Sequence, residues 1–286
     1  MRKTRIAMAA MGAIAALTLS ACGGNGGGGA GGGETGGGTE GGETIRIGIK
    51  YDQPGLGFQS GGEYTGFDVD VAKYVANELG YSEEQIEFVE SPSANRENML
   101  ANGQVDMIFA TYSITDERKQ TVDFAGPYFV AGQDLLVSAE NTDINGPDDL
   151  NGKNLCSVTG STSAQRIKDE HAQEVNLLER PGYAECVTAM QSGQIDAVTT
   201  DDIILAGLAA QPNFAGKFKV VGNPFSEERY GVGLPKGTEL CADINAAINK
   251  MVEEGAWEEA LTANTEGVDY TFNEELNPPT PGDSCA

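Results

Sequence analysis

One short pattern occurs twice in this chain and limits the folds that the chain can adopt. Residues 99–106 read Met-Leu-Ala-Asn-Gly-Gln-Val-Asp, and residues 189–196 read Ala-Met-Gln-Ser-Gly-Gln-Ile-Asp. In both, a helical stretch ends at a glycine, which suits a helix C-cap, and an apolar strand follows. The pattern can recur by chance, because it is a common connection from helix to strand. It also fits two similar α/β lobes, each presenting the carboxyl end of that strand.

The chain from Thr44 onward alternates between strand-like and helix-like segments. Alternating apolar residues and short apolar runs predict strands over 45–49, 86–89, 105–110, 135–137, 155–158 and 195–199. Apolar residues at helical spacing predict helices over 68–79, with Asp68 as the N-cap, and over 95–102, 162–172, 183–192 and 202–210. This alternation is typical of an α/β fold with parallel neighbouring strands.

Small polar residues follow several of these strands. In open α/β sheets, ligands bind beyond the carboxyl ends of the strands, beside helix N-termini. Two predicted strands end at Ala110–Ser113 and at Thr199–Asp201, and a loop of small residues, Val158–Ser163, enters a helix. We therefore expect two lobes to face each other across these ends and to form a ligand cleft.

The N-terminal segment has the features of a secretory signal. Residues 1–21 join a basic start to an apolar stretch that is too short and too alanine-rich for a membrane span. The stretch ends in Leu-Ser-Ala before Cys22, which resembles a bacterial lipobox with Cys22 as the lipidated residue. Residues 22–43 are mostly glycine and predict a flexible tether. We expect an extracytoplasmic protein anchored to the outer face of the cell membrane. The alternative is an ordinary signal peptide followed by a stray cysteine.

The charge of the chain excludes some partners. A formal net charge of −25 is unsuited to nucleic acid or to an anionic membrane surface. It also means that an acidic ligand would have to be attracted by a few local cations inside the cleft. No cysteine and histidine residues have the spacing of metal ligands, and the chain has one histidine, His171. We expect neither a metal nor a cofactor.

The cysteines predict disulfides. If Cys22 carries a lipid, four cysteines remain in an oxidising compartment, and three pairings are possible. We favour Cys156–Cys186 and Cys241–Cys285, because each pair would close one local unit. The first pair closes a loop of roughly 30 residues, which is worth about 3–4 kcal/mol in the chain-entropy model.

Three separated motifs then point to a known family. Gly-Phe-Asp-Val-Asp-Val-Ala at 66–72, Thr-Asp-Glu-Arg at 115–118 followed by Val-Asp-Phe at 122–124, and Tyr-Gly-Val-Gly-Leu-Pro-Lys-Gly at 230–237 resemble family 3 solute-binding proteins. These proteins serve ABC importers of polar amino acids, and the likeness covers 44–265.

A subgroup of this family is closer still. Residues 48–55, 90–94 and 155–162 resemble the glutamate-binding lipoproteins of Gram-positive importers, and Cys156 and Cys186 match that subgroup. Cys241 and Cys285 have no counterpart there, so their pairing rests on parity.

The resemblance implies a periplasmic-binding-protein-like fold of type II. Such a protein has two α/β lobes joined by a two-strand hinge, with the ligand cleft between them. Lobe 1 would comprise 44–128 plus 230–270, lobe 2 would comprise 133–225, and 271–286 would form a C-terminal tail. The ligand bridges the lobes, and the importer's permease subunits recognise the closed form. We expect a monomer with no enzymatic activity.

The resemblance also implies binding roles. Arg118 matches the arginine that clamps the ligand α-carboxylate, a task that suits a guanidinium fork. Ser113 would add its hydroxyl and N–H, and Thr162 an N–H from the facing lobe. Asp201 matches the carboxylate that receives the α-ammonium, helped by the Thr111 carbonyl. From the residues alone, Arg118 could instead begin a solvated helix, and Asp201 could be a helix N-cap.

The side-chain pocket is defined by two further cations. Lys50 stands where a related glutamine binder has an acidic residue, and Arg96 could also reach the pocket. Together they favour a ligand with a second carboxylate, so glutamate or aspartate comes first and glutamine next. The alternative is that both are surface charges. Gln53 stands where the family often places an aromatic ring, so Tyr51 or Tyr112 could take over that contact.

Two other function classes fit the same fold. A dehydratase related to this family would need a positioned general acid or base in the cleft. A receptor could use the fold without transport, and neighbouring permease and ATPase genes would separate it from an importer component.

Overall fold

The computed structural model describes residues 43–171, 175–282 and 285. The predicted signal peptide, almost all of the tether and the lipidation site Cys22 lie outside these residues. The described residues form one compact unit. Within the described part, no helix is both long and apolar enough to cross a membrane.

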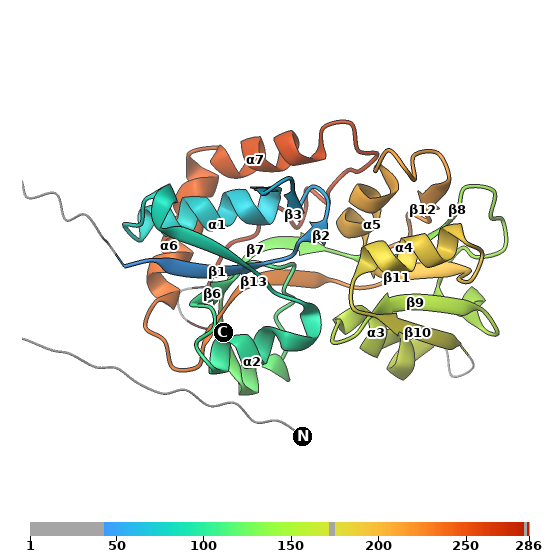
Figure 1. The fold of residues 1–286 in the computed structure, drawn as a ribbon, viewed down its shortest axis with the longest axis horizontal. Helices are drawn as coiled ribbons and strands as arrows, with labels where there is room; N and C mark the ends of the chain where they lie inside the picture. The colour runs from blue at the N-terminus through green and yellow to red at the C-terminus, as the bar shows by residue number, and fades with distance from the viewer. Residues whose placement is uncertain (1–42, 172–174, 283–284, 286) are drawn as a thin grey trace, which may run out of the picture. The chain divides into compact units, whose positions relative to one another are not determined.

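Ten of the described strands form two five-stranded sheets with the same order of equivalent strands (Figure 1). The first sheet has the order β5-β1-β6-β13-β7, with β5 at Ile86–Glu90, β1 at Ile45–Ile49, β6 at Met107–Ile108, β13 at Glu228–Pro235 and β7 at Val122–Ala131. The second has the order β10-β9-β11-β8-β12, with β10 at Asn176–Arg180, β9 at Asn154–Val158, β11 at Ala197–Asp201, β8 at Gln133–Ser138 and β12 at Phe218–Val220. In each sheet the first three strands are parallel, and the fourth strand pairs antiparallel with both of its neighbours.

The repeated sequence pattern corresponds to a repeated structure. Both copies end directly before the middle strand of a sheet, β6 in the first and β11 in the second. The last aspartate of each copy also makes the same contact. Asp106 accepts the Arg46 N–H at 2.8 Å, and Asp196 accepts the Asn154 N–H at 2.7 Å. The pattern therefore marks equivalent positions in two similar halves.

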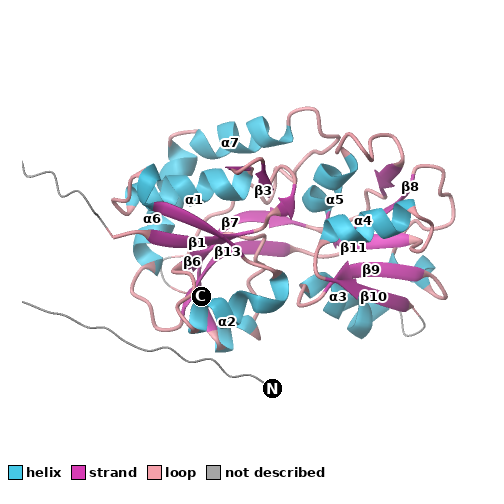
Figure 2. Cartoon of the chain, viewed as in Figure 1, coloured by secondary structure: helices cyan, strands magenta, loops and turns pink. Residues whose placement is uncertain are grey.

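Helices pack on these sheets (Figure 2). With the first sheet lie α1 at Phe67–Glu78, α2 at Arg96–Ala101, α6 at Cys241–Glu253 and α7 at Ala256–Thr265. With the second lie α3 at Thr162–Arg166, α4 at Tyr183–Gln191 and α5 at Asp202–Ala209. Alternation along β6 sends successive residues to opposite faces of the sheet. Met107 accordingly joins the apolar cluster under α1 and α6, and Ile108 joins the one under α2.

Two antiparallel segments connect the sheets. Strand β7 continues into β8 through Gly132, and the returning chain enters β13, whose Glu228 pairs with Ala131. A Cβ on Gly132 would overlap the side chain of Pro224, so this crossing has no room for a larger residue. The polar cleft described below lies beside these crossings.

The other edge of β7 is covered by polar groups from the C-terminal part of the chain. Gly126 donates its N–H to Asn245 at 2.6 Å, and Trp257 donates its indole N–H to the Tyr128 carbonyl at 2.8 Å. The Asn277 amide pairs with both the N–H and the carbonyl of Val130. Side chains thus replace a neighbouring strand along this edge.

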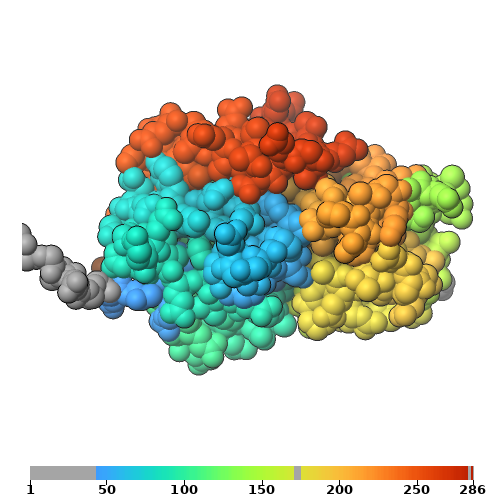
Figure 3. All heavy atoms as spheres, turned by 45° about the horizontal axis from the view of Figure 1, so that its top comes forward, coloured from blue at the N-terminus to red at the C-terminus, as the bar shows by residue number. Residues whose placement is uncertain are grey.

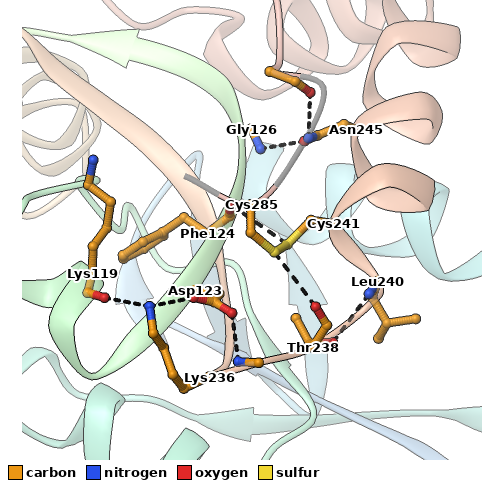
Figure 4. The surroundings of a disulfide bond; sticks show 12 residues. Lys119, Asp123, Phe124, Gly126, Lys236, Thr238, Leu240, Cys241, Asn245 and Cys285 are labelled. Atoms are coloured by element: carbon orange, nitrogen blue, oxygen red, sulfur yellow. Dashed lines mark hydrogen bonds and ion pairs between the residues drawn. A yellow bond between two sulfur atoms is a disulfide. The ribbon is translucent and has the colours of Figure 1, made fainter.

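Both predicted disulfides are confirmed. Cys156 in β9 bonds to Cys186 in α4, and Cys241 at the start of α6 bonds to Cys285. Figure 4 shows the second bond next to Asn245, which donates to the Gly282 carbonyl at 2.5 Å. The C-terminal segment is therefore attached to the body by a covalent bond as well as by hydrogen bonds.

Several predicted elements differ from the structure. Helix α1 is capped by Gly66, so the prediction of Asp68 as its N-cap is wrong. The helix predicted over 162–172 is α-helical up to Arg166 and continues as a π-helix over Ile167–His171. The strand predicted over 105–110 is limited to β6. A small antiparallel sheet was not predicted; it consists of β2 at Asp52–Gln53, β3 at Gly57–Ser60 and β4 at Glu63–Thr65.

Candidate functional site

A small polar cavity lies where the two sheets meet. It brings together six of the predicted ligand-binding residues: Arg96, Thr111, Ser113, Arg118, Thr162 and Asp201. Three of these follow β6 and one lies at the carboxyl end of β11, so the cavity occupies the end of each sheet at which open α/β sheets bind ligands. Lys50, the seventh, donates from its Nζ to the hydroxyl of Ser93 at 2.7 Å, and Ser93 lines the cavity.

Arg118 joins the two sides of the cavity. Its Nη1 donates to the Ser113 carbonyl at 2.7 Å, and its Nη2 donates to the Gly160 carbonyl at 3.0 Å. Its Nε lies 3.5 Å from a carboxylate oxygen of Glu97. Arg118 does begin a short 3-10 helix, Arg118–Gln120, but its side chain is 10% exposed. It is therefore held in the cavity wall and is not a solvated charge at a helix start.

The facing wall is the start of α3. Ser161 caps this helix, accepting the Ala164 N–H at 3.0 Å. The hydroxyl of Thr162 lies 3.4 Å from that of Ser113 and donates to Glu228 at 3.1 Å. The Thr162 hydroxyl thus connects the first sheet, the start of α3 and the crossing segment.

Asp201 adds a carboxyl group to the cavity wall. It occupies the N-cap position of α5, but its side chain makes no capping hydrogen bond. Its Oδ2 accepts the Tyr230 hydroxyl at 2.5 Å, and its buried Oδ1 has no partner among the described residues. Burial, and then the nearby charge of Glu228, raise the pKa of this carboxyl well above its usual range. A cation beside Oδ1 would favour the ionised form.

Two buried cations belong to this region: Arg96 lines the cavity, and Lys50 contacts the lining residue Ser93. Arg96 begins α2 and is 2% exposed, and its Nη1 donates to the Ala110 carbonyl at 3.0 Å. Burial and the charge of Arg118 lower its pKa to about 10. Lys50 follows β1 and is 5% exposed, and burial together with Arg96 lowers its pKa to about 7. In the described part of the chain, neither Lys50 nor Arg96 forms an ion pair with a carboxylate.

Unpaired polar atoms gather at the same place. Among the described residues, the buried side-chain nitrogen and oxygen atoms without a hydrogen-bond partner are Gln53 Nε2, Arg96 Nε and Asp201 Oδ1. Arg96 and Asp201 line the cavity, and Gln53 Oε1 lies 3.2 Å from the hydroxyl of Thr111, which also lines it. Since buried polar groups in folded proteins nearly always have partners, these atoms indicate a polar ligand with both donors and acceptors.

The structure also places the aromatic residues. Tyr51 and Tyr112 do not line the cavity. The Tyr112 ring is fully buried beneath both arginines, 4.1 Å from the Arg96 guanidinium and 4.9 Å from that of Arg118. The aromatic residue in the cavity wall is Tyr183, at the start of α4, which the sequence analysis missed. A tyrosine after Pro-Gly carries no sequence signal that would have distinguished it.

A metal ion needs several acidic, histidine or cysteine side chains arranged around it. In the parts of the chain that the structure describes, no group of three or more histidine, cysteine or acidic side chains could hold a metal ion. The polar cavity is instead lined by arginines, hydroxyl groups and one carboxylate with a free oxygen. These groups can bind a small zwitterion through charge and hydrogen bonds.

Two similar α/β halves, connected by two antiparallel segments and enclosing a polar cavity between them, define a bilobal ligand-binding protein. The chain belongs to the bacterial extracellular solute-binding proteins, family 3, whose family model matches residues 45–264. Its fold is accordingly that of the type II periplasmic binding proteins, as predicted.

Individual relatives agree with this assignment. The glutamate-binding protein GluB of Corynebacterium glutamicum is 43% identical over 95% of this chain and 92% of its own. The ABC transporter glutamine-binding protein GlnH of Bacillus subtilis is 39% identical over 90% of this chain and 95% of its own. Among solved structures, an ancestral arginine-binding protein bound to glutamine has a TM-score of 0.71 and 35% identity, covering 77% of this chain and 96% of its own.

Proposed function

We propose that this protein is the substrate-binding component of an ABC importer for an acidic amino acid, with glutamate as its ligand. Arg118 would hold the α-carboxylate, assisted by Ser113 and Thr162. Asp201 would receive the α-ammonium together with the Thr111 carbonyl. A zwitterion needs one fixed cation and one fixed anion, and the cavity offers Arg118 and the free oxygen of Asp201 for these roles.

The observation that carries the choice of ligand is the pair of buried cations, Lys50 and Arg96. Burying a charge is costly unless it is paired, and neither cation has an ion-pair partner among the described residues. The side-chain carboxylate of glutamate would supply that partner and would also satisfy Arg96 Nε. The name of the GluB relative supports the same ligand.

We further propose that binding closes two lobes, comprising 44–128 with 230–270 and 133–225. Contacts between these ranges support this idea. Arg118 reaches the Gly160 carbonyl, and the Asp52 carboxylate accepts the Tyr183 N–H at 2.9 Å, at the first residue of α4. Closure would assemble such contacts around the ligand and create the surface that the importer's membrane subunits recognise.

The membrane anchor belongs to the same proposal. The family is extracellular, and a lipid on Cys22 would keep the protein at the outer face of the cell membrane. Residues 22–43 would then give the binding unit room to reach the importer. Replacing Cys22 with serine should release the protein from membranes into the medium, and retention on membranes would contradict lipidation at this residue.

Glutamine is the second candidate, because the GlnH relative is a glutamine-binding protein and an amide oxygen could also accept from Arg96. Calorimetry of the purified protein with glutamate, aspartate, glutamine and asparagine separates the candidates. We expect glutamate to bind with a dissociation constant in the micromolar range or below, and glutamine to bind at least about tenfold more weakly. Tight binding of glutamine alone would keep the importer assignment and reject the acidic pocket. Binding of none of the four would reject the proposed function.

A further inference from the structure

One wall residue of the cavity has an unusual backbone. Thr111 has a φ of 46°, and it is the one non-glycine residue of the described chain with a positive φ. A β-branched residue in this left-handed region is strained, and such strain persists only where the surrounding structure enforces it. Something near Thr111 must therefore hold this conformation.

The group that holds Thr111 comes from the first turn of α1. Asp68 is fully buried, and its Oδ2 accepts the Thr111 N–H at 3.0 Å. Its other oxygen accepts the Tyr128 hydroxyl at 2.8 Å, and its own N–H donates to the Leu56 carbonyl at 3.1 Å. Two hydrogen bonds thus fix the carboxylate, a third fixes the backbone of Asp68, and one of the carboxylate's bonds restrains the strained peptide.

The residues on either side of Thr111 place the two arginines of the cavity. The Ala110 carbonyl accepts from Arg96 Nη1, and the Ser113 carbonyl accepts from Arg118 Nη1. A change of backbone direction at Thr111 would turn both carbonyls relative to each other. Each guanidinium group would then lose one of the contacts that hold it in the cavity wall.

We propose that Asp68 is a positioning residue for ligand binding. By holding Thr111 in the left-handed conformation, it sets the separation of Arg96 and Arg118. Asp68 does not line the cavity, so it acts through Thr111 and not by touching the ligand. This role rests on the proposed function, because its effect would be measured as a change in the affinity for an amino acid.

A double-mutant cycle tests this role, because glycine adopts a positive φ without strain. Calorimetry with glutamate would compare the parent protein with Asp68→Ala, Thr111→Gly and the double variant. We expect Asp68→Ala to weaken binding about tenfold or more in the parent background, and threefold or less when residue 111 is glycine. An equal loss in both backgrounds would overturn the inference, because it would show that Asp68 does not act through Thr111.

Asp68→Asn separates position from charge and is also the variant to use if Asp68→Ala does not fold. An amide oxygen can still accept the Thr111 N–H, and the Tyr128 hydroxyl can accept from the amide nitrogen. We expect Asp68→Asn to bind glutamate within about threefold of the parent. A loss of tenfold or more that persists with glycine at 111 would assign the effect to the charge of Asp68 and overturn the positioning role.

Failure of the proposed function would be recognised separately, because the parent protein would then bind none of the four amino acids. In that case a crystal structure of the Asp68→Ala variant decides the inference. A Thr111 φ that has left the positive region supports the role of Asp68, and an unchanged φ overturns it.

Discussion

Gly207 lies inside helix α5, where a larger residue would be favourable for the helix alone. Glycine in a helix interior costs roughly 0.5–1 kcal/mol relative to alanine. A Cβ on Gly207, however, would overlap the backbone carbonyl oxygen of Pro54, which belongs to the turn between β2 and β3. Figure 3 shows these two segments side by side, the blue one around residues 50–60 and the orange one around residues 200–210. One methyl group would thus favour the helix and oppose the contact between the lobes.

The expected changes in ligand affinity and in Tm for Gly207→Ala follow from these two effects. Overpacking against a group that cannot turn away typically costs about 1–3 kcal/mol. If only the closed form makes this contact, the whole cost falls on ligand binding and corresponds to a loss of affinity of roughly 5- to 150-fold. In that case the lobes of the ligand-free protein would be apart, and this form would keep the gain in helix stability. For a body of this size, that gain raises Tm by about 1–4 °C.

The assay combines calorimetry with glutamate and thermal unfolding without ligand. Gly146→Ala is the matched control, because a Cβ there meets no atom within 4 Å and its φ of −175° is open to alanine. We expect the control to leave the glutamate affinity unchanged and Gly207→Ala to weaken it while Tm rises. Unchanged affinity in Gly207→Ala would show that α5 and the β2–β3 turn do not meet in the bound form. A fall in both Tm and affinity would show that Gly207 is needed for packing in every state.

Three further predictions concern the cavity and the C-terminal segment. Arg118→Ala should weaken amino-acid binding by at least about 1,000-fold, because the α-carboxylate loses its bidentate cation; near-normal affinity in calorimetry would remove Arg118 from the site. Burial lowers the pKa of Lys50 to about 7, so a ligand that needs its charged form should bind about tenfold more weakly at pH 8 than at pH 6. Lys50→Met should abolish this dependence, and a persistent pH slope in that variant would assign it to another group. Cys285→Ser opens a loop with a sequence separation of 44 residues and should lower the free energy of unfolding by about 2–4 kcal/mol, measured by urea denaturation, with glutamate affinity unchanged. A large loss of affinity would instead connect the C-terminal segment to binding.

The fold could be predicted where local pattern and topology agree. The repeated pattern placed equivalent strands in the middle of both sheets, since a helix, a glycine C-cap and a strand are specified by neighbouring residues. Strands β7 and β13 were missed, because β7 is buried along its whole length and therefore lacks the alternation that marks a half-buried strand. The N-cap of α1 was wrongly predicted at Asp68, because the side chain of Asp68 bonds to the backbone of Thr111 and not to its own helix. Its partner Thr111 is distant in the sequence, and no local signal reveals such a bond.

The candidate site could be predicted as far as the family motifs reached. Arg118 and Asp201 matched motif positions, and the structure places both in one cavity. Tyr183 and Glu228 were not foreseen, because their proximity to the cavity residues depends on how the chain returns between the two sheets. The left-handed conformation of Thr111 was also beyond the sequence analysis, since threonine ordinarily avoids it.

A crystal structure of the glutamate complex is the most direct test of the central claim, which is that Lys50 and Arg96 select an acidic side chain. We expect the side-chain carboxylate of the ligand to lie about 3 Å from Arg96 Nε and from Lys50 Nζ, with the α-carboxylate on Arg118. A bound amino acid whose side chain leaves both Lys50 and Arg96 without contact would contradict the claim.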